Sequence, residues 1–184
     1  MGFDRIGGPG LSRLSTAVSP GGGGGIKSVQ SGRISSTGVH TQVIEAIRPQ
    51  QSILLWKPLL HPDSRICSYA RIDSPTTLAI DGISSGHYGG DWSVIEFSSG
   101  IKSIQRGVAV RTDNSFASFN VSISPVDTDR SVINLTGSSA GDGAGNSINA
   151  LISRAEFLST TNVRFLSSSS FAPNYVAYEI VEFA

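Results

Sequence analysis

The chain of 184 residues has one cysteine, Cys67, and few charged residues. A single cysteine excludes an intramolecular disulfide and a metal site built from several cysteines, so we expect Cys67 to be a small apolar core residue. Charged residues make up 15% of the chain, and 14 basic residues balance 14 acidic ones. Such a surface attracts neither nucleic acid nor anionic membranes and does little to prevent self-association. We therefore expect a homo-oligomer with no nucleic-acid partner and no membrane partner.

Long apolar runs are absent as well. No run approaches the roughly 18 residues of a membrane span, and Met1 is not followed by the charged and apolar regions of a signal peptide. These absences predict a soluble protein that is made in the cytoplasm without a secretion signal.

Motifs of catalysis and cofactor binding are also missing. There is no Gly-x-x-x-x-Gly-Lys-Ser/Thr phosphate loop and no Gly-x-Ser-x-Gly nucleophile turn. No two histidines have the spacing that would put them on one metal ion; the three are His40, His61 and His87. Asp127, Asp129 and Asp142 offer oxygen ligands for calcium, but Asp-x-Asp after a proline is more typical of a turn whose carboxylates accept backbone N–H groups. We expect no metal, no cofactor and no enzymatic activity.

Residues 1–25 differ in composition from the rest of the chain, with nine glycines and two prolines. Such a segment cannot bury enough apolar surface to fold by itself. We predict an N-terminal arm that docks on a partner in a larger assembly. Its glycine run consists of Gly21, Gly22, Gly23, Gly24 and Gly25.

The remainder of the chain is a tandem repeat. Ile-Lys-Ser-Val-Gln-Ser-Gly at 26–32 returns as Ile-Lys-Ser-Ile-Gln-Arg-Gly at 101–107, and Trp-Ser-Val-Ile-Glu-Phe at 92–97 returns as Tyr-Glu-Ile-Val-Glu-Phe at 178–183. The offset grows from 75 to 86 residues between these signatures, as it does when loops of the second copy gain residues. We divide the chain into the arm, a first repeat at 26–99 and a second repeat at 100–184.

Two internal anchors agree with this division. Ser52–Leu55 aligns with Ser131–Leu135 at an offset of 79, and Thr76-Thr77 aligns with Thr160-Thr161 at an offset of 84. A repeat of about 80 residues is only marginally stable by itself, so we expect the two repeats to pack against each other or against neighbouring subunits.

Alternating apolar and polar residues predict strands, and turn residues separate the runs. Asn149–Leu158 could form a helix, but its counterpart Ile66–Ile72 alternates, so we expect strand in both. Five or six short strands per repeat predict an all-β fold of two tandem β-sandwich domains, jelly-roll-like or small barrels. The clearest alternating runs lie at 116–124, 132–135 and 161–166.

Paired carboxylates invite a glycosidase interpretation, because Glu96 and Glu182 hold matching positions in the closing signatures. Each glutamate belongs to its own repeat, however, which favours an inherited structural role. We expect them to bond the equally repeated Lys27 and Lys102 across neighbouring strands.

The best candidate for a binding surface is the predicted loop at 84–92. Its aromatic rings beside glycines and a carboxylate are suited to stacking on a sugar and accepting its hydroxyl bonds. The residues are His87, Tyr88, Asp91 and Trp92. The alternative is a hairpin whose Trp92 enters the core as the first residue of the closing strand.

The signatures resemble small β-rich virion structural proteins of tailed bacteriophages, of the decoration or fibre type. Three segments carry the resemblance: 101–107, Ile-Ser-Pro-Val-Asp at 123–127 before Arg130-Ser131-Val132, and 178–183. It is looser over 26–97, where Ser31 replaces the arginine and Pro49-Gln50-Gln51 replaces Pro-Val-Asp. The resemblance implies a virion setting and brings no catalytic residues with it.

We expect a structural virion protein, either capsid decoration or a head or tail accessory, that binds other virion proteins through residues 1–25. Two similar units per chain suggest a trimer presenting six units. The alternative is a tail-fibre or receptor-binding protein that recognises host glycan through the loops at 84–92 or 137–146. A third hypothesis is a glycan hydrolase that uses Glu96, Glu182 or Asp91.

Overall fold

The computed structural model describes residues 25–37, 40–58, 68–81, 87–112, 118–140, 152–167 and 174–184. Within these ranges the regular elements are strands and two single-turn 3-10 helices, η1 (Pro49–Gln51) and η2 (Thr128–Arg130). The predicted all-β fold is confirmed. Cys67, Gly21–Gly24 and Asp142 lie outside the described residues.

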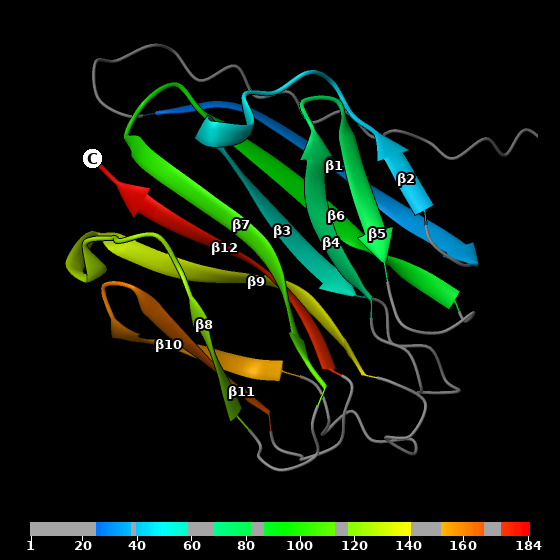
Figure 1. Cartoon of the computed structure of the whole chain (residues 1–184). Helices are drawn as coiled ribbons and strands as arrows, with labels where there is room; N and C mark the ends of the chain where they lie inside the picture. The colour runs from blue at the N-terminus through cyan, green and yellow to red at the C-terminus, as the bar shows by residue number, and fades with distance from the viewer. Residues whose placement is uncertain are drawn as a thin grey trace, which may run out of the picture.

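The described part of the first repeat contains six strands, and so does that of the second (Figure 1). Those of the first are β1 (Ile26–Thr37), β2 (His40–Val43), β3 (Ser52–Pro58), β4 (Tyr69–Ser74), β5 (Thr77–Asp81) and β6 (His87–Phe97). Those of the second are β7 (Ile101–Arg111), β8 (Ser118–Ser122), β9 (Ser131–Ala140), β10 (Ile152–Ser159), β11 (Asn162–Ser167) and β12 (Asn174–Phe183). The ambiguous segment at 149–158 therefore contributes a strand, β10, as expected.

The two repeats have the same strand order. The first pairs β1-β6-β3 in one sheet and β2-β5-β4 in another, and the second pairs β7-β12-β9 and β10-β11-β8. All of these pairs are antiparallel. Because each strand has its counterpart at the same place in the sheet, the tandem duplication inferred from the signatures extends to all of the described strands.

One alignment anchor shifts by a residue. The hairpin Ser74–Thr77 corresponds to Ser159–Asn162, because the Thr76 N–H donates to Ser74 Oγ at 3.2 Å and the Thr161 N–H donates to Ser159 Oγ at 3.2 Å. The offset there is 85, so the alignment of Thr76-Thr77 with Thr160-Thr161 is wrong by one position. The offset still rises steadily along the chain.

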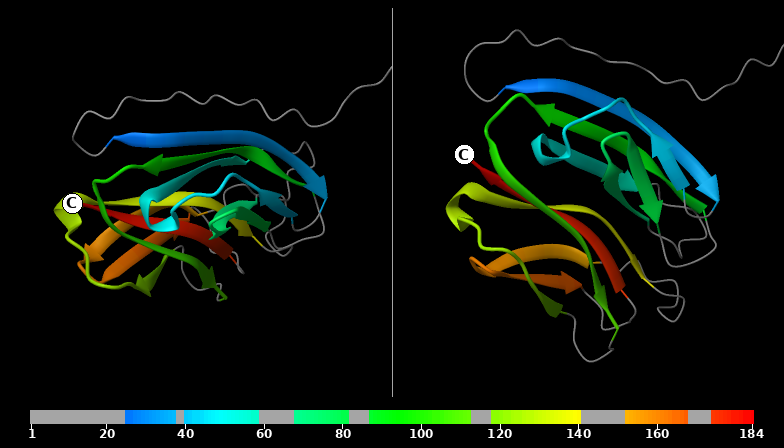
Figure 2. Two further views of the ribbon diagram at one scale, coloured as in Figure 1. Left: turned by 90° about the horizontal axis from the view of Figure 1, so that it is seen from above. Right: turned by 45° about the horizontal axis from the view of Figure 1, so that its top comes forward.

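Each repeat has its own apolar core between its two sheets. Leu54, Leu78 and Trp92 lie in the core of the first repeat, and Phe165 and Ile180 lie in that of the second. Figure 2 shows the strands of the two repeats as adjacent groups, the first coloured from blue to green and the second from green to red. Burial on one face explains the alternation in strands such as β3, where buried and more exposed residues alternate from Ser52 to Trp56.

The repeats are joined at a sheet edge. Tyr69 of β4 pairs with Gly137 of β9, which makes β2-β5-β4-β9-β12-β7 a single six-stranded sheet across the predicted boundary. A third apolar cluster, with Ile53 of the first repeat against Ile104 and Val181 of the second, lies beside this junction. The folding of each repeat as an independent domain stays a prediction.

Gly137 was expected to open a loop but lies inside β9, which continues to Ala140. Its φ of +110° is unfavourable for other residues, and a Cβ there would lie 2.5 Å from the Ser68 carbonyl oxygen. Glycine at this position therefore lets β4 approach β9 closely enough to join the repeats.

We predict that Gly137→Ala lowers the free energy of unfolding by about 2 kcal/mol or more, because it combines backbone strain with a backbone clash. Urea denaturation measures the change. Gly107→Ala is the control for an added methyl group at a glycine without a positive φ, since its Cβ would meet the side chain of Tyr178, 2.6 Å from the hydroxyl oxygen, and not the backbone. Equal losses in the two variants would contradict this explanation.

Candidate functional site

A buried carboxylate ends the closing strand of the first repeat. Glu96 is 2% exposed, and its Oε1 accepts from Lys27 Nζ at 3.0 Å and from Arg48 Nε at 2.8 Å. It also accepts from the Arg48 backbone N–H at 3.3 Å and from Ser28 Oγ at 3.3 Å. Glu96 thus connects β1, β6 and the turn that precedes η1.

Glu182 repeats this arrangement in the second repeat. Its Oε1 accepts from Lys102 Nζ at 2.8 Å and from the Asp127 backbone N–H at 3.1 Å, and its Oε2 accepts from Ser103 Oγ at 3.0 Å. The expected bonds between the repeated lysines and glutamates are confirmed. Both carboxylates bind their own fold, which explains their repetition without catalysis.

These contacts stabilise the ionised glutamates. Burial opposes ionisation of Glu96, but hydrogen bonds from Arg48 and Lys27 outweigh it and place its pKa below the ordinary value. The Lys102 ammonium, followed by the Asp127 N–H, lowers the pKa of Glu182. Each carboxylate is therefore suited to be a permanent anion rather than a proton donor near neutral pH.

The repeated glutamine of the opening signature bonds the first strand of each repeat to the segment that follows the second strand. Gln30 accepts from the Glu45 N–H at 2.7 Å and donates to the Glu45 carbonyl at 3.0 Å. Gln105 makes the same two bonds to Ser124, at 2.8 and 2.9 Å. The lysine, serine and glutamine of the signature therefore all bind the fold itself.

One polar site differs between the repeats, and it lies where they meet. Arg106 of β7 donates through Nε to Glu179 Oε1 at 2.8 Å and through Nη2 to the carbonyls of Pro49 at 2.8 Å and Ser52 at 2.5 Å. Arg106 is 17% exposed and the Glu179 side chain 3%. A buried ion pair thus reaches from the second repeat to η1 and the start of β3.

Glu179 and Asn134 complete this contact. The Leu54 N–H donates to Glu179 Oε2 at 3.0 Å, and Asn134 Nδ2 donates to the Leu54 carbonyl at 2.7 Å and to Glu179 Oε2 at 2.9 Å. Leu54 lies on β3, the end strand of its sheet. We call Arg106, Asn134 and Glu179 the inter-repeat clamp, because they satisfy backbone groups on the free side of that strand.

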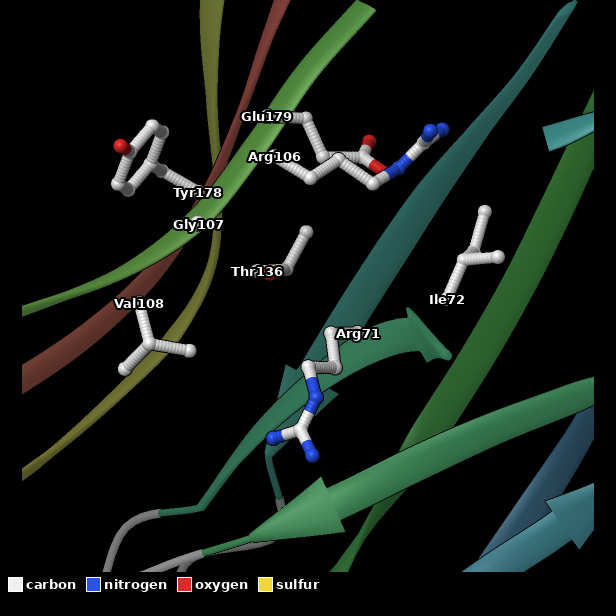
Figure 3. Close-up of a pocket in the computed structure, with 8 residues that line it drawn as sticks. All are labelled: Arg71, Ile72, Arg106, Gly107, Val108, Thr136, Tyr178 and Glu179. Carbon is white, nitrogen blue, oxygen red and sulfur yellow. The ribbon is translucent and has the colours of Figure 1, made fainter. Parts of the chain in front are cut away.

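A small pocket lies beside the clamp, between β4 of the first repeat and the β7-β12-β9 sheet of the second (Figure 3). Its volume is about 110 Å³. Arg71 and Arg106 stand at opposite ends with Thr136 between them, while Tyr178 points away (Figure 3). The lining residues are Arg71, Ile72, Arg106, Gly107, Val108, Thr136, Tyr178 and Glu179.

The chemistry of this pocket is limited by its ion pairs. Arg71 bonds Asp81, and Arg106 bonds Glu179, so each guanidinium is already neutralised by a carboxylate. The volume is below the roughly 300–1,000 Å³ of pockets that enclose drug-sized ligands. The pocket has room for water or a small ion, and the arrangement around it is that of a protein interface.

The clamp has no chemical equivalent in the first repeat. The strand register places Ser31, Ser93 and Leu55 at the positions of Arg106, Glu179 and Asn134. Ser31 and Ser93 bond each other through their hydroxyls at 2.8 Å, and Leu55 is 46% exposed. The same face of the fold is therefore covered in one repeat and open in the other.

The residues predicted to form a binding loop lie in a strand instead. His87, Tyr88, Asp91 and Trp92 all belong to β6, and Trp92 is 4% exposed in the core. Asp91 accepts from Arg33 Nε at 2.6 Å, and this hydrogen bond lowers the pKa of Asp91. The side chains of His87 and Tyr88 lie outside the described part, so sugar binding stays a prediction.

The Asp-x-Asp segment forms the expected turn, since Asp127 Oδ1 accepts from the Asp129 N–H at 3.0 Å. Among the described residues, no group of three or more His, Cys, Asp or Glu side chains is placed to hold a metal ion. No helix in the described part of the chain is long and apolar enough to cross a membrane.

The clamp could have been noticed in the sequence as a difference between repeats. Arginine at 106 against serine at 31, and glutamate at 179 against serine at 93, put charge in only one copy of each signature. Nothing in the sequence says, however, that the two charges pair or that β3 covers them.

We predict that Arg106→Ala destabilises the protein by about 3 kcal/mol, because it leaves Glu179 buried without its cation. Chemical denaturation measures the loss. Ser31→Ala removes the side chain at the matching exposed position and should stay within about 0.5 kcal/mol of the wild type. Similar losses in both variants would contradict a specific clamp.

We also predict acid sensitivity from Glu96 and Glu182. Because the fold lowers both pKa values, their contribution to stability is present above the unfolded pKa, near 4.5, and is lost as pH falls through the lower folded pKa. The double variant Glu96→Gln/Glu182→Gln should be less stable at pH 7 and lose less stability below pH 4.5. Asp129→Asn controls for removal of an exposed carboxylate, and an unchanged pH profile in the double variant would refute the assignment.

Comparison of the chain with protein-family models, with curated proteins and with solved structures gives no match.

Proposed function

We propose that this protein is a structural component of a tailed-phage virion that acts by assembly rather than by catalysis. The observation that carries the proposal is the interface between its repeats. There, the end strand of one β unit docks on the sheet face of a second unit through Ile53, Leu54 and the inter-repeat clamp. One copy of this β unit therefore buries part of its surface against a second, similar β unit.

The polar residues support the same conclusion. Glu96, Glu179 and Glu182 are each 3% exposed or less and each accepts a backbone N–H of the chain. Catalytic acids and bases need an accessible substrate and a pKa matched to proton transfer. These carboxylates instead have bonds that hold strands and turns in place.

The resemblance of segments 101–107, 123–132 and 178–183 to virion proteins of tailed phages supplies the setting. The glycine-rich residues 1–25 supply the means of attachment in this proposal, because a segment whose composition does not let it fold by itself can become ordered on a partner surface. Capsid decoration and a head or tail accessory role both fit it.

We predict that tailed particles purified from cells encoding this chain contain it at a constant ratio to the major particle proteins. Recombinant chain should also co-sediment with particles that lack it, and deletion of residues 1–25 should abolish co-sedimentation. Mass spectrometry and density-gradient centrifugation measure the two results. Circular dichroism of the shortened chain controls for folding.

A chain that stays out of the particles would refute the structural role. If it then bound host-cell glycan, and if His87→Ala or Tyr88→Ala removed that binding while the fold survived, receptor binding would replace it.

A further inference from the structure

The end strands of the sheets are protected to different degrees. The free side of β3 is covered by the inter-repeat clamp, and β10 packs beside β9 and β12. β2 and β8 are short, with four and five residues. β7 has η1 against it, since Gln51 Nε2 donates to the Ile101 carbonyl at 3.0 Å.

β1 differs from all of these. It pairs with β6 from Ile26 to Thr37, and within the described part of the chain no strand pairs with its other side. Twelve residues make it the longest strand described, and its register shifts only between Ile26 and Ser28. A long, regular end strand presents a row of backbone donors and acceptors to any strand that can lie beside it.

The devices that usually prevent such pairing are weak in β1. The strand contains no proline, and its two cations are neutralised by the neighbouring strand. Lys27 bonds Glu96, and Arg33 bonds Asp91. Between these cations the outward side chains are Val29 and Ser31, which carry no charge that would oppose the approach of a second strand.

We propose that β1 pairs antiparallel with β1 of a second copy of this chain, so that two β1-β6-β3 sheets become one six-stranded sheet and the assembly is a dimer, in place of the trimer suggested by the two units per chain. The chain itself provides the precedent, because β4 and β9 already join two three-stranded sheets edge to edge. This inference rests on the proposed function, since it names the surface through which the structural subunit associates with itself.

The charges of β1 and the sheet faces on which its side chains lie both allow this pairing. Gln30, Gly32 and Ile34 face the core side of the sheet, whereas Ser31 and Arg33 face outward. A pair centred on Gly32 puts core-facing residues opposite core-facing residues, and it puts Arg33 opposite Ser31 of the second copy. No two cations of β1 oppose each other in this register, and a neutral chain adds no long-range repulsion.

The test is sedimentation equilibrium of the full chain over a range of concentrations, with two matched lysine variants. Ser31→Lys adds a cation on the end strand, opposite Arg33 of the partner copy. Ser93→Lys adds the same charge on the same face but one strand further in, and both variants remove the same hydroxyl pair. We expect a wild-type dimer, a dissociation constant about tenfold higher for Ser31→Lys, and little change for Ser93→Lys.

Hydrogen exchange gives a second readout that needs no substitution. Backbone amides of β1 should become more protected as the protein concentration rises, whereas those of β7 should not. Circular dichroism of both variants shows whether the fold is retained.

Four results would overturn the pairing: a wild-type monomer, a wild-type trimer, a dimer that Ser31→Lys leaves intact, or equal dissociation by both variants. If the protein occurs in particles but Ser31→Lys stays dimeric, the pairing fails and the structural role survives. If Ser31→Lys dissociates a dimer that never enters particles, the pairing stands and the role fails.

Discussion

The fold depends on a buried anion at the same position of each repeat. Glu96 and Glu182 stand at the end of the last strand of their repeats, and each binds the lysine near the start of the first strand and a backbone N–H before the 3-10 turn. Residues from the two ends and the middle of each repeat thus converge on one carboxylate. A contact of this kind fixes the strand order, because any other order would leave the glutamate buried without its partners.

Comparison of the two repeats shows which residues this shared set of contacts allows to differ. Residues that bond within a repeat, such as the signature glutamines, have kept their partners, whereas residues on the outer sheet face have diverged. The first repeat has three surface residues here, Ser31, Leu55 and Ser93. The matching positions of the second repeat are the clamp residues Arg106, Asn134 and Glu179. Divergence therefore follows the environment of each position rather than its place in the strand.

The sequence was informative about the architecture for a physical reason. Alternation records which face of a strand is buried, and duplication let an ambiguous segment, now β10, be assigned by its counterpart. The pairing of Lys27 with Glu96 followed from repetition alone. In contrast, the segment at 87–92 contains Gly89, Gly90 and Asp91, which favour turns locally, but long-range pairing with β1 and β3 draws it into a strand. Contacts between repeats, including the clamp, depend on tertiary geometry that no local pattern records.

Edge-to-face contact between the repeats also limits how often the unit can be repeated. A contact that joins different surfaces of identical units can continue indefinitely, in a longer gene or a filament, unless something closes it. Here β9, the counterpart of the docking strand β3, is already joined to β4, and the first repeat has Ser31 and Ser93 where the clamp would be needed. A third unit would meet a β9 strand that is already bridged to β4 at Gly137 and a first-repeat face without the clamp residues, so it could not add through this same contact.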